Sequence, residues 1–342
     1  MIRKELMEAR YYITEEGQDI RCNLCPHNCL LKNGQSGICR VRKNRDGILL
    51  SENYGKVCSL HLDPIEKKPL YHYYPGRNIL SVGTVGCNLH CRFCQNWEIS
   101  QTNVKDYPYL KEYSPASIVD MAAAEAGNLG IAYTYNEPTV WYEFMKDIAD
   151  KAIDAGLNNI VVTNGFINPD PLKELIPVIH AFSVDLKAFT EAFYKQLTSS
   201  SLAPVLESLK TIRASDRHLE MTNLLIPDEN DNEKDFRKMM EWINKELGPD
   251  TVLHISRFFP TYKLTHNATP ESLLKKFYEI AREYLHYVYL GNVSSDKGRD
   301  TYCPKCGHLL ISRSGYHTRL AGLEDDKCAK CGEAIPVVVQ RA

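Results

Sequence analysis

From about residue 79 onward, short runs rich in β-branched and aromatic residues alternate with segments whose hydrophobic positions recur at helical period. This alternation is typical of repeated βα units built around a parallel sheet. The pattern predicts strands at Ile79–Val85, Gly130–Tyr135, Asn159–Thr163, Ala181–Leu186, His218–Ile226, Val252–Phe258 and Tyr287–Leu290.

Helices are predicted in the intervening segments, at Pro115–Gly127, Thr139–Ala155, Pro171–Ile179, Glu191–Leu197 with Leu202–Ala214, Glu233–Leu247 and Pro270–Leu285. Several begin with a proline or with a Ser, Thr or Asp in the first turn, as helix starts do. Six or seven units are too few for a complete eight-stranded barrel of ~250 residues. We therefore expect an α/β fold, a partial (β/α)6 TIM-like barrel with small cysteine-rich modules at both ends.

The length of 342 residues suits one barrel-sized domain with small appendages. We expect a cysteine-rich module and lead-in over 1–75, the barrel over 76–295 and a second small module over 296–342. Hydrophobic residues at 44% and charged residues at 25% are ordinary for a soluble enzyme. The formal net charge of -2 gives no global basic field, which leaves nucleic acid neither indicated nor excluded as a partner.

Export and membrane insertion have no signal in the sequence. No apolar run approaches the ~20 residues of a membrane helix, and the N-terminus lacks the apolar core of a signal peptide. We expect a cytoplasmic protein without a membrane partner. Its twelve cysteines are grouped at ligand spacing in a long chain, so metal binding explains them better than disulfides do.

The central cysteines Cys87, Cys91 and Cys94 have the spacing C-x3-C-x2-C directly after the first predicted strand. Three thiolates can hold three corners of a [4Fe-4S] cluster and leave the fourth iron open to a small molecule. The next cysteine downstream, Cys303, belongs to a motif of its own. The alternatives are a zinc knuckle or buried structural cysteines.

With aromatic Phe93 before its last cysteine, this triplet resembles the signature of radical S-adenosylmethionine (SAM) enzymes. The resemblance implies a split barrel and a cluster whose open iron binds the amino and carboxylate groups of SAM. It also implies reductive cleavage of SAM to methionine and a 5′-deoxyadenosyl radical, which abstracts hydrogen from a substrate. A reductant such as flavodoxin or ferredoxin would supply the electron.

Further candidate SAM-binding residues lie just after the predicted strands. In α/β barrels the catalytic groups come from the loops at the carboxyl ends of the strands. Asn96 stands where activating enzymes of glycyl-radical enzymes have an Asn near SAM, although it could instead cap a turn. Glu137 occupies the place of the family's Gly-Gly-Glu-type segment without its glycines, and it could be a helix-start carboxylate. Thr163 and Asn164 precede a glycine in a Thr-Asn-Gly segment similar to that of activating enzymes.

Asp185 and Lys187 lie two residues apart at the end of the fourth strand and so share a face. The resemblance assigns this Asp-x-Lys pattern to the activating-enzyme branch, with Lys187 paired to the carboxylate of SAM. A structural ion pair is the alternative. His254, Arg257 and Tyr262 could reach SAM or substrate, and His254 could equally be a hydrogen-bonded wall residue.

Two further cysteine groups predict metal sites at the ends of the chain. Near the C-terminus, two C-x2-C-G knuckles suit a tetrahedral ion, zinc in preference to rubredoxin-like iron, held by Cys303, Cys306, Cys328 and Cys331. Near the N-terminus, zinc and a second iron–sulfur cluster are equally compatible with the spacing of Cys22, Cys25, Cys29 and Cys39. His27 could replace one of these cysteines, and Cys58 reads as a buried small hydrophobe.

Over most of residues 20–300 the chain resembles the AmmeMemoRadiSam-system branch, whose members are often labelled pyruvate formate-lyase activating-enzyme homologues. The segments that carry this likeness include Asp63-Pro-Ile-Glu-Lys-Lys-Pro-Leu70, otherwise readable as a surface loop with paired charges. The leading hypothesis is a radical SAM enzyme with an unidentified substrate, for which a glycyl-radical protein is one candidate. RNA, a peptide or a metabolite are alternative substrates, and an electron-carrier or interaction protein is the alternative of another class.

Overall fold

The computed structural model describes residues 7–339, and an eight-stranded sheet forms its centre. Seven neighbouring strands run parallel, in the spatial order of the chain, so the sheet can curl into part of a barrel. These strands are β8 (Asn78–Gly83), β10 (Asn128–Tyr133), β11 (Asn158–Thr163), β12 (Ala181–Asp185), β13 (His218–Leu225), β14 (Val252–Arg257) and β15 (Val288–Gly291).

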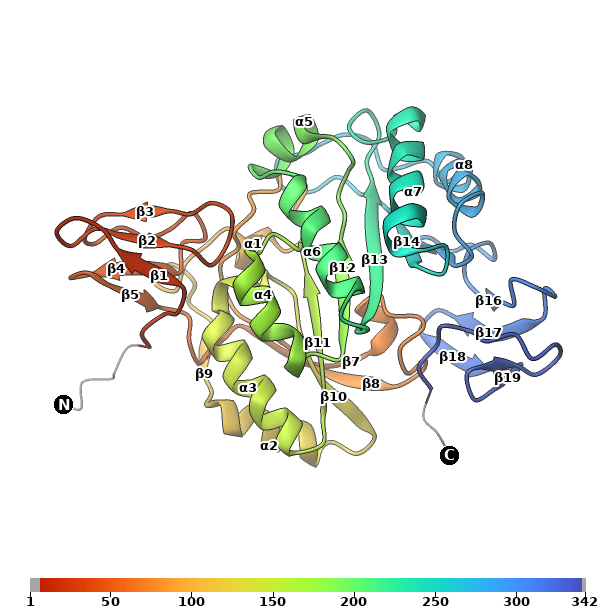
Figure 1. The fold of residues 1–342 in the computed structure, drawn as a ribbon, viewed down its shortest axis with the longest axis horizontal. Coiled ribbons are helices and arrows are strands. Elements are labelled where there is room, and N and C mark those ends of the chain that lie inside the picture. The colour runs from red at the N-terminus through yellow and green to blue at the C-terminus, as the bar shows by residue number, and fades with distance from the viewer. Residues whose placement is uncertain (1–6, 340–342) are drawn as a thin grey trace.

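Helices connect the parallel strands and line up along one face of the sheet, from α2 to α8 (Figure 1). They begin where the sequence supplies capping groups: Ser114 accepts a hydrogen bond from the amide of Ser117, and Asn232 accepts from Lys234 and Asp235. The helices are α2 (Pro115–Ala124), α3 (Tyr142–Asp154), α4 (Pro169–Leu175), α5 (Glu191–Phe193), α6 (Ala203–Arg213), α7 (Glu233–Leu247) and α8 (Glu271–Arg282).

The expected fold class is confirmed, with one strand more than the sequence pattern predicted. Strand β7 (Ser59–Pro64) pairs antiparallel with β8 at the edge of the sheet. The sheet therefore begins within the segment that we expected to lead into the barrel. Leu60 and Leu62 alternate there with polar residues, but two hydrophobic positions, one of them exposed, are too short a pattern to mark a strand.

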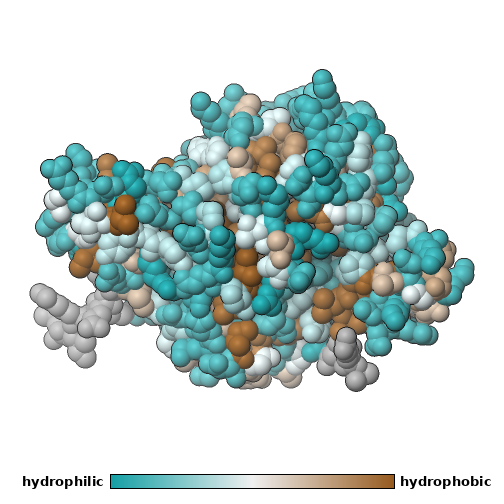
Figure 2. Space-filling view, in the orientation of Figure 1, coloured by the Kyte–Doolittle hydropathy of each residue, from teal (hydrophilic) through white to brown (hydrophobic). Residues whose placement is uncertain are grey.

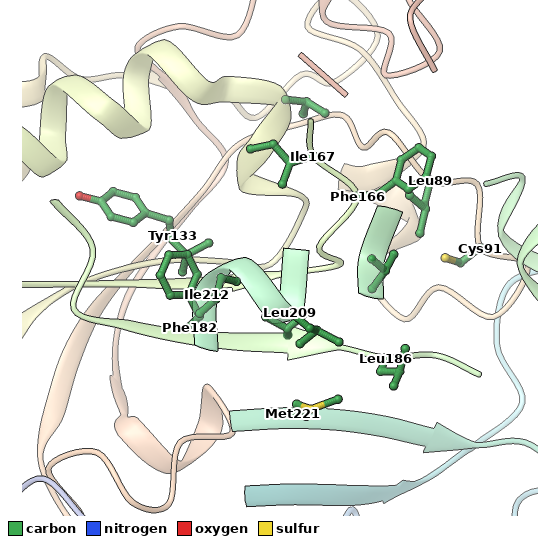
Figure 3. Packing of buried hydrophobic residues seen from close by; sticks show 14 of the residues in the cluster. Leu89, Cys91, Tyr133, Phe166, Ile167, Phe182, Leu186, Leu209, Ile212 and Met221 are labelled. Carbon is green, nitrogen blue, oxygen red and sulfur yellow. The ribbon is translucent and has the colours of Figure 1, made fainter. Parts of the chain in front are cut away.

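The main core lies between the sheet and its helices. Figure 3 shows Phe182 and Met221 of the neighbouring strands β12 and β13 facing Leu209 and Ile212 of α6, all of them buried. Burying one such side chain stabilises the fold by roughly 1.5–3 kcal/mol. Cys91 lies at the margin of this same cluster, so the core fixes one side of the central cysteine group.

Small antiparallel modules flank the barrel on opposite sides (Figure 1). The N-terminal module contains β1 (Tyr12–Thr14), β2 (Ile20–Cys22), β3 (Leu30–Leu31), β4 (Arg42–Arg45) and β5 (Ile48–Ser51). The C-terminal module contains β16 (Thr301–Tyr302), β17 (Leu309–Ser314), β18 (His317–Leu320), β19 (Leu323–Glu324) and β20 (Lys327–Cys328). A short pair, β6 (Lys56–Val57) with β9 (Lys111–Glu112), and the single-turn helix α1 (Trp97–Ser100) complete the elements near the barrel mouth.

The surface seen in Figure 2 is mostly hydrophilic, and its hydrophobic residues form small separate spots. Among the helices of residues 7–339, none combines the length and the apolar character that crossing a bilayer would require.

Candidate functional site

A cavity of about 740 Å³ opens at the carboxyl ends of the parallel strands. This volume lies within the range of small-molecule and cofactor sites. Ten of the residues that the sequence suggested for the central cluster and for SAM line it: Cys87, Cys91, Phe93, Cys94, Asn96, Glu137, Thr163, Asn164, Asp185 and Lys187. Ten positions spread over 101 residues of sequence therefore meet in one space.

The three central cysteines are free thiols on the loop that follows β8. Burial raises the pKa of the Cys87 and Cys91 thiols, the latter to about 12, so both would be neutral without a bound cation. A metal reverses this preference, because only the thiolate is a ligand. The amide of Leu89 donates to Cys87 Sγ over 3.4 Å, which is one contact that a thiolate would strengthen.

Glu137 organises the ends of two neighbouring strands. Its Oε1 accepts hydrogen bonds from the hydroxyls of Thr139 and Thr163, both at 2.7 Å, and its Oε2 accepts from the amide of Asn164 at 2.8 Å. Burial raises its pKa despite these bonds. Glu137 does cap the short helix Pro138–Trp141 through the Thr139 amide, yet its contacts to Thr163 and Asn164 go beyond a helix-start role.

The two candidate asparagines are held by hydrogen bonds across the site. Asn96 makes no side-chain cap to α1, and its Nδ2 instead donates to the carbonyl of Tyr135 at 2.8 Å. Asn164 Nδ2 donates to Asn88 Oδ1 at 2.9 Å and lies 3.9 Å from Cys87 Sγ. The Thr-Asn-Gly segment is therefore tied directly to the cysteine loop.

Asp185 and Lys187 form an ion pair, with 2.9 Å between Oδ2 and Nζ. Burial alone would lower the pKa of Lys187, but Asp185 and the nearby Cys91 raise it above its usual value. The Lys187 ammonium also lies 5.9 Å from the centre of the Phe93 ring. The side chains of Asp185 and Lys187 are 40% and 14% exposed, so the carboxylate keeps a free oxygen toward the cavity.

The cavity has a second charged wall that the sequence argument undervalued. The ammonium of Lys68 is buried and lies 2.8 Å from Asp63, which also accepts from the hydroxyl of Tyr135 at 2.6 Å. Burial would raise the pKa of Asp63, but these hydrogen bonds hold it below its usual range. The alternative of a surface loop with paired charges does not hold for this pair, because the side chains of Lys68 and Asp63 are only 3% and 10% exposed. The sequence signal that could have indicated this buried pair was the placement of Asp63 and Lys68 next to the two prolines of the segment.

Tyr135 has φ of 73°, a conformation that a non-glycine residue seldom adopts and that often marks a functional site. Its hydroxyl contacts Asp63, while Lys68 lies 4.8 Å from its ring centre. Gly315 and Tyr316, at the tip of the β17–β18 hairpin, close the same side of the cavity. No local pattern links that distant hairpin to the barrel.

Three looser candidates lie outside the set of described residues that line the cavity. His254 Nε2 is 2.6 Å from Glu220, a buried carboxylate that also accepts from His218 and from the amides of Tyr71 and His72. His254 is thus a hydrogen-bonded residue of the barrel wall that does not line the cavity. Arg257 donates to the carbonyl of Thr269, and Tyr262 stacks on Trp97 with 5.2 Å between ring centres.

The C-terminal cysteines converge on one point. The sulfurs of Cys303, Cys306, Cys328 and Cys331 all lie within 4.8 Å of one another, with 3.6 Å between Cys303 and Cys331 and 3.7 Å between Cys306 and Cys328. Ligands ~2.3 Å from a tetrahedral ion stand about 3.8 Å apart. This group could therefore hold a single metal ion.

The N-terminal cysteines Cys22, Cys25, Cys29 and Cys39 surround a small enclosed space of about 20 Å³. His27 lines it too, but its Nε2 is engaged at 2.7 Å by the carbonyl of Asn88. Cys58 stands apart from the three cysteine groups, with its sulfur 2.9 Å from the carbonyl of Thr84. Cys58 is half-buried, whereas we expected a buried residue from the sequence.

A cluster with one open iron needs three free thiols. A zwitterionic ligand on that iron needs a cation and a carboxylate beside the thiols and a space of ligand size. These residues fit that pair of groups. The fold and the site together define a split α/β barrel whose cavity is lined by thiols and by a cation–carboxylate pair.

Comparison with known proteins specifies the family. The family model of the radical SAM superfamily matches residues 81–243. An uncharacterised protein of Methanocaldococcus jannaschii is 43% identical over 338 residues, covering 98% of this chain and 100% of that protein. The pyruvate formate-lyase-activating enzyme of Listeria monocytogenes is 24% identical over 172 residues, covering 46% of this chain and 66% of that enzyme.

A crystal structure of a radical SAM methyltransferase from Sphaerobacter thermophilus shares the fold, with a TM-score of 0.50 and 15% identity over 69% of this chain and 71% of that one. The chain belongs to the radical SAM superfamily. Membership implies an enzyme that uses a [4Fe-4S] cluster and SAM.

Proposed function

We propose that this enzyme cleaves SAM reductively at a cluster held by Cys87, Cys91 and Cys94 and abstracts hydrogen from a substrate bound in the same cavity. The cluster and SAM would supply the chemistry, a one-electron cleavage that yields methionine and a 5′-deoxyadenosyl radical. The observation that carries the proposal is the convergence of the three free thiols with Asp185 and Lys187 on one cavity.

The residues around the cysteines have separate tasks in this proposal. Lys187 pairs with the carboxylate of SAM, for which its pKa, raised above the usual value, keeps it charged. Glu137 Oε2 accepts one hydrogen bond from the protein and retains capacity for the α-amino group. Its bonds to Thr163 and Asn164 fix the wall on which the ligand rests.

In this proposal a second set of residues in the same cavity faces the substrate. Asp63, Lys68 and Tyr135 place one ammonium, one carboxylate and one hydroxyl at the cavity, and Tyr316 covers them from the C-terminal hairpin. The relatives named as activating enzymes, which include one for 4-hydroxyphenylacetate decarboxylase in Clostridium scatologenes at 21% identity, favour a glycyl-radical protein as substrate. Electrons would come from an external donor of flavodoxin or ferredoxin type.

The test is release of 5′-deoxyadenosine from SAM by anaerobically reconstituted protein with dithionite. We expect release by the native chain and complete loss in Cys87→Ala, whose cluster lacks one ligand. Cys58→Ala is the matched control and should keep the native rate, because the Cys58 sulfur hydrogen-bonds to the carbonyls of Gly83 and Thr84 and the residue does not line the cavity. No release from native protein that holds iron and sulfide, or undiminished release from Cys87→Ala, would refute the proposal.

The substrate class needs a second readout. Glycyl-radical activation predicts an organic radical on a co-incubated partner protein, detected by electron paramagnetic resonance. A radical or a labelled product confined to RNA, a peptide or a metabolite would reject protein activation and would leave SAM cleavage standing.

A further inference from the structure

The two four-cysteine groups of this chain differ in the spacing of their sulfurs. Among residues 7–339, the C-terminal four alone bring three or more candidate ligand atoms within 4.8 Å of one another. The N-terminal sulfurs are therefore spread more widely, although all four face the same enclosed space. A tetrahedral zinc with ligands at ~2.3 Å needs sulfurs about 3.8 Å apart, which the C-terminal group provides.

The space between the N-terminal sulfurs is also too large for a bare ion. Its volume of about 20 Å³ exceeds the ~10–15 Å³ that a water molecule needs. Four sulfurs around a zinc ion leave no such void. A cubane cluster is larger, and it separates its cysteine sulfurs by roughly 6 Å.

The central cysteines give an internal calibration. They belong to the loop with which this family holds a [4Fe-4S] cluster, and their sulfurs likewise fall outside the 4.8 Å grouping among the described residues. The sulfurs of the N-terminal and central groups are therefore spaced more widely than those of the C-terminal group. The N-terminal group resembles the cluster site and differs from the single-ion site.

A buried donor without a partner lies beside the N-terminal group. Arg42 is 1% exposed and lines the space between the sulfurs, with its Nη1 on both oxygens of Glu143 at 2.8 and 3.0 Å. Its Nε has no hydrogen-bond partner among the residues that the structure describes. A buried unpaired N–H is costly, and the anionic sulfurs of a metal–thiolate site, including the sulfides of a cluster, can accept this donor.

We propose that Cys22, Cys25, Cys29 and Cys39 hold a second [4Fe-4S] cluster, with Arg42 Nε donating to it. This cluster has four protein ligands and no open iron, so it does not bind SAM. It lies against the loop of the central group: a Cβ on Gly86, the residue before Cys87, would be 2.7 Å from the carbonyl oxygen of Cys39. The hydrogen bond between His27 and the carbonyl of Asn88 ties the same two loops together.

The experiment removes the central site and counts what remains. Full-length protein with Cys87, Cys91 and Cys94 all changed to Ala is reconstituted anaerobically with ⁵⁷Fe and sulfide. We expect about four iron and four sulfide per chain and a Mössbauer spectrum of a [4Fe-4S] cluster. Adding Cys22→Ala and Cys39→Ala should remove the iron and sulfide, whereas adding Cys58→Ala should not.

The outcomes are distinct and do not depend on SAM cleavage. Zinc at the N-terminal site, seen as two zinc ions and no iron in the triple variant, would overturn the inference, as would a single sulfide-free iron. The Mössbauer measurement on the triple variant decides between these results even if the fivefold variant does not fold.

Discussion

The N-terminal and C-terminal modules each present four cysteines among short antiparallel strands, yet the N-terminal module has one Cys-x2-Cys pair and the C-terminal module has two, and their sulfurs are arranged differently. The C-terminal knuckles bring sulfurs to 3.6 and 3.7 Å, the spacing of a single tetrahedral ion. The N-terminal loops leave a space of about 20 Å³ between theirs. Cysteine spacing along a chain thus predicts that a metal is held, whereas the sulfur spacing in the fold indicates which kind.

The modules also attach to different sides of the barrel. The N-terminal module contacts the central cysteine loop through His27 and Asn88. The C-terminal module contacts the segment after β7, where Thr318 donates to Glu66 at 2.7 Å and Arg313 Nη2 donates to the carbonyl of Tyr71 at 2.8 Å. We therefore expect the first module to influence the cluster and the second to shape the substrate wall.

Removing one cysteine of the C-terminal group should have the largest effect. Cys306→Ser removes one of four ligands from a module with a small core, and structural zinc contributes apparent binding energies on the order of 10 kcal/mol. We expect the bound metal to be lost and amide protection across 301–338 to collapse in hydrogen exchange. Iron content should stay at the level of Cys58→Ser, the control; retained protection in Cys306→Ser would contradict a structural metal.

Loss of the buried ion pair between Arg42 of the N-terminal module and Glu143 of α3 should come second. Glu143→Ala leaves the Arg42 guanidinium uncompensated in the interior, which costs roughly 3–5 kcal/mol. The midpoint of urea unfolding should fall accordingly. Asp150→Ala, which breaks the exposed pair with Lys146 on the same helix, should change stability by less than about 0.5 kcal/mol. Equal effects of the two variants would mean that the buried pair has no special role.

Acidification should lower the free energy of unfolding gradually, because His72 helps to attach the C-terminal module. Burial lowers the pKa of His72 to about 3, and its ring contacts the carbonyl of Pro336 and the hydroxyl of Tyr289. Between pH 6.5 and about 3 the unfolded chain binds a proton that the folded chain excludes, so stability falls as pH decreases, by at most ~1.4 kcal/mol per pH unit. The stability contributed by neutral His72 is fully present above pH 6.5.

Chemical denaturation at several pH values measures this slope. His72→Gln keeps hydrogen-bonding groups and cannot titrate, so its stability should vary less over the same range. An unchanged slope in that variant would assign the acid sensitivity to other groups, such as Glu220, whose pKa lies well below its usual value.

The amino-acid sequence was sufficient to predict the parallel strands, their helices and the grouping of the central site. Strand ends are marked by local chemistry, and parallel strands bring those ends to one edge. This is why Glu137, Asn164 and Lys187 could be expected near Cys87 before any contact was known. The helices that begin at Pro115 and Glu233 were predicted at those residues, and the structure adds Ser114 and Asn232 as their caps.

Other features were decided by the tertiary structure. The edge strand β7, the burial of Lys68 against Asp63, and the approach of Tyr316 to the cavity depend on contacts between segments far apart in the chain. The distance between cysteine sulfurs is of the same kind, because ligand spacing in sequence permits both a tight and a wide arrangement. Local pattern determined which residues face the site, and long-range packing determined how far apart their reactive atoms stand.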